Sequence, residues 1–140
     1  MIAFFPGKFQ PPHLGHVLTI MSVYDLYDEI IIGITDDGPF ICPRPYTKEV
    51  FEKVFRFLPK VRIVLIDGIL CDKKSLLGLP RFNVLLSGNP DVIDWAIKHN
   101  ANCENIPRSE GLGFSGTGIR SIPEYKSKVL TSTERANENI

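Results

Sequence analysis

The chain has 140 residues, a length typical of one domain. Sixteen Lys and Arg balance sixteen Asp and Glu, so the formal net charge is zero, and the 44% share of hydrophobic residues is typical of a globular protein. A neutral chain lacks the cationic excess with which proteins bind nucleic acids or anionic membranes in general. Any anion must therefore be bound at a local site.

The first third of the chain predicts a strand, a helix and a second strand. Ile2 to Phe5 is a short apolar run that ends at Pro6-Gly7, and such a run suits a strand buried in the middle of a parallel sheet. Glu29 to Thr35 shows the same pattern. Between them, His13 to Tyr27 predicts a helix, because four apolar residues lie at helical spacing: Val17, Ile20, Met21 and Tyr24.

A loop, a second helix and a third strand follow. Asp36 to Tyr46 is rich in Gly and Pro, which indicates a turn-rich loop. Thr47 can cap the next helix, Pro59 ends it, and Val61 to Ile66 predicts a strand. The expected buried face of this helix is an i, i+3/i+4 stripe made of Val50, Phe51, Val54, Phe55 and Leu58.

Two more strands and one more helix complete the predicted elements. Asp67 to Phe82 mixes charged residues with Gly and Leu, which predicts a loop with one turn of helix. Asn83 to Ser87 predicts a strand, and Cys103 to Ile106 a brief last one. Gly88-Asn89-Pro90 supplies a turn, an N-cap amide and a proline at the first helical position, so we expect a helix over Asp91 to Asn100.

The order of these elements predicts an α/β fold. Strands that alternate with helices form a parallel sheet with right-handed crossovers. We expect a doubly wound, Rossmann-like sheet of five parallel strands with helices on both faces, formed by residues 1–122. Residues 123–140 are polar and predict a tail, a short helix followed by disorder. Ligands of such sheets bind beyond the carboxyl ends of the strands, so residues just after each strand are candidates for a site.

A first candidate site is the segment GKFQPPHLGH, residues 7–16, between the first strand and the first helix. His13 and His16 are three residues apart, which puts both imidazoles on one face of a helical first turn, near backbone N–H groups that favour an anion. Gly15 lets a ligand approach the backbone there. With Lys8, the imidazoles form a cluster of donors of the kind that phosphoryl transfer needs. The alternative is two partly buried polar residues at a helix start, but the preceding strand, the following helix and Lys8 favour the site.

A second candidate site is the segment GLGFSGTGIR, residues 111–120. Its glycines allow backbone N–H groups to close on phosphate oxygens, while Ser115 or Thr117 can cap a helix. Arg120 adds a fork-shaped charge that suits phosphate. The alternative is a flexible Gly-Ser loop that caps a short helix, and Arg120 favours the phosphate site over it.

The two motifs, H-x-G-H after the first strand and S-x-T-x-I-R late in the chain, resemble those of the nucleotidyltransferase superfamily. The spelling GKFQPPHLGH, together with SGNP (Ser87 to Pro90) and FSGTGIR, is most similar to the archaeal-type nicotinamide mononucleotide adenylyltransferases. The resemblance covers roughly residues 2–121. It implies transfer of AMP from ATP to a small phosphorylated acceptor, most like nicotinamide mononucleotide, with Mg²⁺ present and pyrophosphate released.

The resemblance also implies roles for individual residues. His13 and His16 are expected to hold the α-phosphate and the bridging oxygen, and Lys8 replaces an arginine or threonine common in the family. Arg120, with Ser115 and Thr117, is expected to hold the β- and γ-phosphates. The expected nucleotide-binding set is completed by Gly7, Phe9, Gly15, Asn89 and Gly116. No acceptor-binding or metal-ligating residue is assigned.

Two other functions remain open at this point. One is a cytidylyltransferase that uses CTP and a phosphorylated alcohol; Phe9-Gln10-Pro11 favours the adenylyl reaction, because cytidylyl enzymes more often read F-D there. The other is a catalytically weak nucleotide-binding module, against which His13, His16 and Arg120 argue.

Several polar and aromatic residues have simpler interpretations than a role in the site. Asp36 and Asp37 read as a turn, and His99 as a cation near the negative end of its helix. Trp95 is expected to pack in the core. A solvated loop is the interpretation preferred for Lys73, Lys74 and Arg81.

The three cysteines, Cys42, Cys71 and Cys103, are widely spaced, which indicates neither a disulfide framework nor a zinc site. A reducing compartment suits them. The sequence shows no signal segment and no apolar run of about 18 residues, so we expect a cytoplasmic protein with no membrane partner. The resemblance implies a homo-oligomer, and the neutral charge predicts no nucleic-acid partner.

Overall fold

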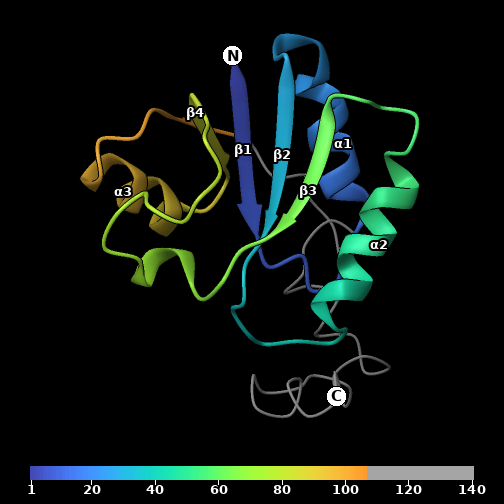
Figure 1. Cartoon of the computed structure of the whole chain (residues 1–140), viewed down its shortest axis with the longest axis horizontal. Coiled ribbons are helices and arrows are strands. Elements are labelled where there is room, and N and C mark those ends of the chain that lie inside the picture. Colours follow the sequence, from blue (N-terminus) through green and yellow to red (C-terminus); the bar gives the residue numbers. More distant parts are fainter. Residues whose placement is uncertain (107–140) are drawn as a thin grey trace.

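The computed structural model describes residues 1–106 and shows a five-stranded sheet. The strands lie in the order β3-β2-β1-β4-β5, and all neighbouring pairs are parallel (Figure 1). The strands are β1 (Ile2–Gly7), β2 (Glu29–Ile34), β3 (Val61–Leu65), β4 (Val84–Ser87) and β5 (Cys103–Asn105). The predicted parallel α/β sheet is therefore confirmed.

The sheet order reverses at its centre, where β1 pairs with β2 on one side and β4 on the other. Ile2 of β1 is opposite Glu29, and the register runs in step to Gly7 opposite Ile34. Parallel strands that end together put their following loops at one edge, and the crevice at such a reversal is the usual ligand site. The loops after β1, β2 and β4 therefore frame the site.

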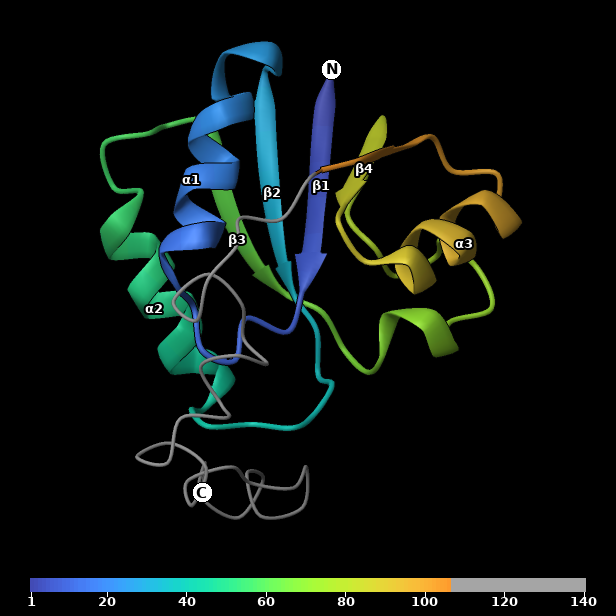
Figure 2. The same cartoon turned by 180° about the vertical axis from the view of Figure 1, so that it is seen from behind.

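Helices cover both faces of this sheet, as Figures 1 and 2 show from opposite sides. One face carries α1 (Leu14–Val23), which continues into a 3₁₀ turn (Tyr24–Leu26), and α2 (Arg44–Val54). The other face carries α3 (Pro90–Lys98) and the 3₁₀ turn Leu70–Asp72. This arrangement confirms the doubly wound architecture. Among the described residues, no helix combines the length and apolar character needed to cross a membrane.

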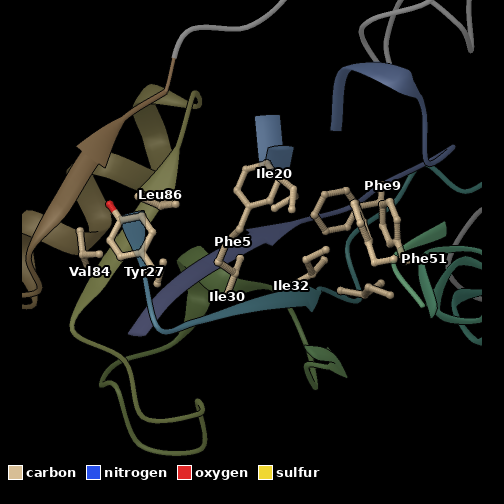
Figure 3. Close-up of a cluster of buried hydrophobic side chains, with 12 residues drawn as sticks. Phe5, Phe9, Ile20, Tyr27, Ile30, Ile32, Phe51, Val84 and Leu86 are labelled. Atoms are coloured by element: carbon tan, nitrogen blue, oxygen red, sulfur yellow. The ribbon is translucent and has the colours of Figure 1, made fainter. Parts of the chain in front are cut away.

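The core on the α1 and α2 face is built from alternate residues of β1 and β2. Phe5, Ile30 and Ile32 point toward Ile20 of α1 and Phe51 of α2, and all five are buried (Figure 3). Each such side chain contributes about 1.5–3 kcal/mol when fully removed from water. The β1 strand reads as apolar throughout because its other residues face the opposite core.

The core on the α3 face centres on Phe4 of β1, Leu85 of β4 and Trp95 of α3. Trp95 is buried, and its Nε1 donates to the backbone oxygen of Lys73 at 2.9 Å. The prediction that Trp95 packs in the core is confirmed. Its indole also ties the loop after β3 to α3, because the Lys73 carbonyl lies in that loop.

The beginning of α2 differs from the prediction. The helix begins at Arg44, with Pro43 as N-cap and a proline in its first turn, whereas Thr47 was expected to cap it. A proline fits the first turn, where its missing N–H is not needed, so the helix begins earlier than a polar cap suggests. Thr47 instead lies fully buried inside the helix.

Two residues of the predicted helical stripes face solvent. Met21 of α1 is 54% exposed and Val54 of α2 is 49% exposed. Helical spacing marks a stripe wider than the surface that the sheet covers, so residues at its margin remain outside. By contrast, the expected Asn89 cap of α3 is confirmed: its side chain accepts the Asp91 N–H at 3.0 Å, and the helix runs from Pro90 to Lys98 where Asp91 to Asn100 was expected.

The predicted boundary at residue 122, the polar tail and the segment 111–120 lie outside the described residues.

Candidate active site

His13 and His16 lie side by side at the start of α1, where the loop after β1 ends. His13 is the N-cap residue, with extended backbone, and the two imidazole rings stack with centroids 3.6 Å apart. The backbone N–H of His13 donates to Nδ1 of His16 at 3.0 Å. Nδ1 of His16 is therefore the acceptor of this bond, which places the proton of the neutral imidazole on Nε2.

The His16 ring rests on two buried phenylalanines. Phe9 meets it edge to face at 4.7 Å between centroids, and Phe51 of α2 lies 6.0 Å away. Phe9 itself is 4% exposed and has a positive φ of 53°. Phe9 was expected to shape a nucleotide pocket, and its side chain lies beneath His16, within the core.

Gly7 and Gly15, both expected to shape the nucleotide pocket, lie in the same segment as these rings. A Cβ on Gly7, the last residue of β1, would lie 2.9 Å from Cζ of Phe9, so only glycine leaves room for that ring. Gly15 is buried in the first turn of α1, between the two histidines. Gly7 thus leaves room for the Phe9 ring, which in turn packs against His16.

Lys8 reaches from the loop after β1 to the loop after β2. Its Nζ donates to the backbone oxygen of Gly38 at 2.9 Å and lies 3.6 Å from the Asp37 carboxylate. The Lys8 side chain is 39% exposed, so the ammonium stays accessible from solvent. Asp37 was read from the sequence as part of a turn, whereas the structure gives its carboxylate an ion-pair partner.

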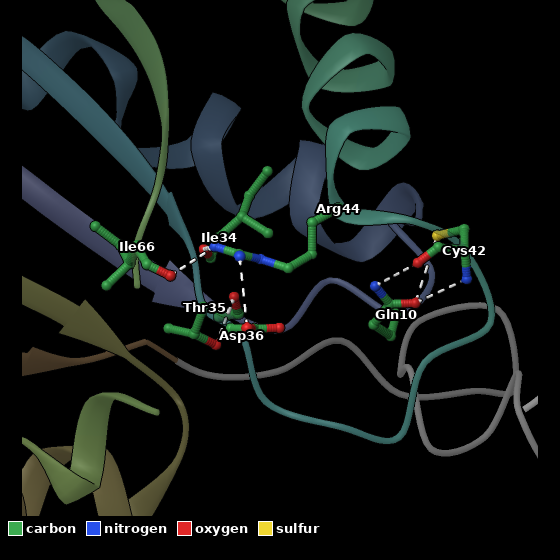
Figure 4. Close-up of polar contacts among 8 residues, drawn as sticks. Gln10, Ile34, Thr35, Asp36, Cys42, Arg44 and Ile66 are labelled. Atoms are coloured by element: carbon green, nitrogen blue, oxygen red, sulfur yellow. Dashed lines mark hydrogen bonds and ion pairs between the residues drawn. The ribbon is translucent and has the colours of Figure 1, made fainter. Parts of the chain in front are cut away.

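Gln10 is a residue of the site region to which sequence reasoning gave no structural role. Its side chain is 1% exposed, and it binds the backbone of Ile41 and Cys42 in the loop before α2 (Figure 4). A polar amide between Phe9 and Pro11 was the available signal. Burial raises the pKa of the Cys42 thiol, which contacts the Gln10 oxygen at 3.4 Å.

Arg44 was also missed, and it joins the ends of β2 and β3. Its Nη2 donates to the backbone oxygens of Ile34 at 2.8 Å and Ile66 at 2.5 Å, and Nη1 lies 3.8 Å from the Asp36 carboxylate (Figure 4). The side chain is nearly fully buried. A guanidinium suits this position because its fork of donors reaches two strands at once. Asp36, read as a turn residue, is thus a partner of a buried cation.

Of the remaining predicted site residues, only Asn89 lies within the part of the chain that the structure describes. Asn89 follows β4, and its amide oxygen is engaged in capping α3. Lys74 and Arg81 are exposed in the loop before β4, as expected of a solvated loop. The predicted phosphate-binding residues Ser115, Gly116, Thr117 and Arg120 lie outside the described part of the chain.

The sequence of this chain is similar to those of known proteins. A model of the cytidylyltransferase-like family matches residues 4–57, which include the histidine pair. Nicotinamide-nucleotide adenylyltransferase 1 of Sulfolobus acidocaldarius is 31% identical over 135 residues, covering 87% of this chain and 77% of that protein. The nicotinamide-nucleotide adenylyltransferase of Sulfurisphaera tokodaii is 36% identical over 136 residues, covering 87% and 78%.

A solved structure shares the fold. The bifunctional NMN adenylyltransferase/ADP ribose pyrophosphatase of Francisella tularensis superimposes with a TM-score of 0.66 at 18% identity, over 97% of this chain and 48% of that one. This chain therefore spans about half of that protein. The family match and the two relatives, together with the paired histidines at the end of β1, show that the chain belongs to the nucleotidyltransferase superfamily, in the family of the nicotinamide-nucleotide adenylyltransferases.

Proposed function

We propose that this protein transfers AMP from ATP to nicotinamide mononucleotide, with release of pyrophosphate. The observation that carries the proposal is the pair of relatives that are 31% and 36% identical over 87% of this chain, since both are named for this reaction. The stacked histidines and Lys8 lie where a parallel sheet with this strand order binds its ligand.

In the proposed reaction, a phosphate oxygen of the acceptor attacks the α-phosphorus of ATP. One P–O bond forms, the bond from the α-phosphorus to the bridging oxygen breaks, and the electron pair leaves with pyrophosphate. A phosphomonoester has a second pKa near ~6 and is largely ionised at neutral pH, so no protein base is needed. Catalysis then consists of positioning and charge stabilisation.

The described residues fit these two tasks. The His16 imidazole is held in a fixed orientation by the His13 backbone and the Phe9 ring, which suits a preorganised contact to a phosphate oxygen. Lys8 adds a positive charge from the adjacent loop. In the proposal, His13 and His16 hold the α-phosphate and bridging oxygen, and Ser115, Thr117 and Arg120 hold the other phosphates.

The described residues offer no ready-made cage for Mg²⁺. Within residues 1–106, no three His, Cys, Asp or Glu side chains converge as metal ligands, and the Asp36 and Asp37 carboxylates pair with Arg44 and Lys8. Mg²⁺ commonly keeps several waters and binds substrate phosphates with one or two carboxylates. We therefore assign it no protein ligand; bound to the nucleotide, it would supply charge neutralisation.

The proposal is tested by incubating the chain and Mg²⁺ with each of the four nucleoside triphosphates and a panel of phosphomonoesters, and by measuring pyrophosphate release. We expect turnover with ATP and nicotinamide mononucleotide, and NAD as the product. Turnover only with CTP and a phosphorylated alcohol would instead establish the cytidylyltransferase. Nucleotide binding without turnover would establish the catalytically weak module.

The proposal extends to the protein's surroundings. We propose a cytoplasmic homo-oligomer without a nucleic-acid partner, on the basis of the free cysteines, the family membership and the neutral charge. Light scattering measures the oligomeric state, and a monomer would contradict it. Binding to nucleic acid with an affinity that falls steeply as the salt concentration rises would contradict the absence of a nucleic-acid partner.

A further inference from the structure

The Gln10 carboxamide forms a clip between two loops that are about thirty residues apart in the sequence. Its Oε1 accepts the backbone N–H groups of Ile41 at 2.8 Å and Cys42 at 3.0 Å. Its Nε2 donates to the backbone oxygen of Cys42 at 2.9 Å. Figure 4 shows the contacts between Gln10 and Cys42. Gln10 is 1% exposed, so these bonds form away from solvent.

The clip lies inside the segment that carries the candidate site. Gln10 follows Lys8 by two residues and precedes His13 by three. The segment to which it is clipped, Ile41 and Cys42, leads directly into α2, whose Phe51 packs against the His16 ring. The geometry of the lysine and the histidine pair therefore depends on the same two loops that Gln10 joins.

This arrangement requires a carboxamide. One oxygen accepts two N–H groups while one nitrogen donates to a C=O, and among side chains of this length only glutamine offers both at neutral pH. An ionised carboxylate of the same length keeps the acceptors but loses the donor, and its charge faces the Cys42 carbonyl. An apolar side chain loses all three backbone bonds and the contact with the Cys42 thiol.

We infer that Gln10 is a positioning residue, whose carboxamide holds the Lys8–His13 loop against the loop before α2 in the arrangement that binds the triphosphate. The inference rests on the proposed function for the identity of the reaction. Beyond the proposed function, the inference says that the buried Gln10 affects the transfer rate and the ATP affinity by positioning Lys8 and the two histidines.

The test compares Gln10→Met with the matched control Thr47→Val. Thr47 is also fully buried, and its Oγ1 lies 3.2 Å from the Cys42 sulfur, so its loss weakens the same region without touching the backbone clip. Below the melting temperature of each variant, Gln10→Met should lower kcat/KM for ATP by up to about 10²-fold per folded molecule, because misplacement of about 1 Å has that cost. Thr47→Val should retain kcat/KM within about twofold. Hydrogen exchange at Ile41 and Cys42 should accelerate only in Gln10→Met.

A second variant, Gln10→Glu, tests the donor and covers the case in which Gln10→Met does not fold. When protonated, the introduced carboxyl can both accept from Ile41 and donate to Cys42; when ionised, it cannot donate. Burial raises the pKa of such a carboxyl. The activity of Gln10→Glu relative to wild type should therefore rise as the pH falls from about 8 to about 6. The known ionisable neighbours, namely the Cys42 thiol, Lys8 and the two histidines, are present in both proteins, so the ratio removes their effect.

Two results would overturn the inference. One is an unchanged kcat/KM in Gln10→Met although hydrogen exchange shows that the loop before α2 has been released. The other is an equal loss of kcat/KM in Thr47→Val.

The affinity for ATP, measured without acceptor, separates this inference from the proposed function. If wild type turns over no acceptor, the proposed function fails, while weaker ATP binding by Gln10→Met than by Thr47→Val still supports the clip. The inference about Gln10 is contradicted if Gln10→Met and Thr47→Val bind ATP equally well, or if the wild-type protein does not bind ATP.

Discussion

His13 donates its backbone N–H to Nδ1 of His16 at 3.0 Å while the two rings stack with centroids 3.6 Å apart. A single pair of residues thus caps α1 and orients an imidazole, because the side chain at the third helical position reaches back to the N-cap as in a capping box. The spacing of H-x-G-H serves both tasks. The start of α1 and the orientation of the His16 imidazole are therefore set by the same pair of residues.

The first prediction concerns His16. We expect His16→Ala to lower the AMP-transfer rate by about 10²-fold or more, because a preorganised donor is lost. The lost reach-back bond costs only about 1 kcal/mol, or a few degrees in Tm. Transfer kinetics and thermal unfolding measure the two effects. Met21→Ala, on the exposed side of the same helix, should leave the rate unchanged, and an unchanged rate in His16→Ala would mean that the motif is structural.

A second prediction concerns the competition between Asp37 and the nucleotide for Lys8. The pair is about one-third exposed and 3.6 Å apart, so it contributes up to about 1 kcal/mol, or about fivefold. Asp37→Asn should lower the KM for ATP by about two- to fivefold. Lys8→Met should raise the KM for ATP, and in a Lys8→Met background Asp37→Asn should no longer lower it. Steady-state kinetics of the double-mutant cycle check this, and additive effects would contradict it.

Alanine substitutions at Gly7 and Gly33 should both lower stability, but only one of them should lower the transfer rate. A Cβ on Gly7 would lie 2.9 Å from the Phe9 ring under His16, and a Cβ on Gly33 would lie 2.5 Å from the Phe4 ring on the opposite core. Each alanine should lower the free energy of unfolding by about 1–3 kcal/mol through overpacking. Only Gly7→Ala should also lower the transfer rate, since the Phe9 ring packs against His16 whereas Phe4 packs in the core on the other face of the sheet. Urea unfolding and kinetics distinguish them, and equal rates in both variants would contradict the role of Phe9.

The buried Arg44 should contribute strongly to stability. Arg44→Met removes two charge-assisted hydrogen bonds to the ends of β2 and β3, so we expect a loss of about 2–5 kcal/mol in urea unfolding. Arg62→Met is the comparison, because Arg62 forms an exposed ion pair with Glu29 that contributes at most about 1 kcal/mol. Similar losses in the two variants would contradict the assignment.

The Cys42 thiol makes stability depend on alkaline pH. Burial raises its pKa in the folded protein, so its contribution is complete below the pKa of the unfolded thiol, near ~8.5, and is lost as the pH rises through the folded value. Urea unfolding at about pH 7.5 and about pH 9.5 should show a larger decline in wild type than in Cys42→Ala. Tyr27, whose pKa is also raised, matters only above about pH 10. Parallel declines would show that Cys42 is not responsible.

The order of elements could be predicted because each depends on local pattern. The apolar run of Ile2 to Phe5 predicts a strand, and Asn89 before Pro90 predicts a helix cap; both depend only on adjacent residues, and both are confirmed. Thr47 was wrong as a cap because the prolines at the helix start, rather than a polar side chain, set where α2 begins. The margins of the helices, such as Met21, depend on how much of a helix the sheet covers.

The sequence by itself determined the parallel α/β fold, the position of the histidine pair and the membership in a nucleotidyltransferase family, because periodicity, capping and motif spacing are local properties. The tertiary structure alone decided which loops meet. Gln10 with Cys42, Arg44 with Ile66, and Lys8 with Asp37 are 22 to 32 residues apart, and each pair is brought together by the sheet order. No local pattern encodes such pairs, because a polar side chain in a loop reads the same whether it faces solvent or a distant backbone.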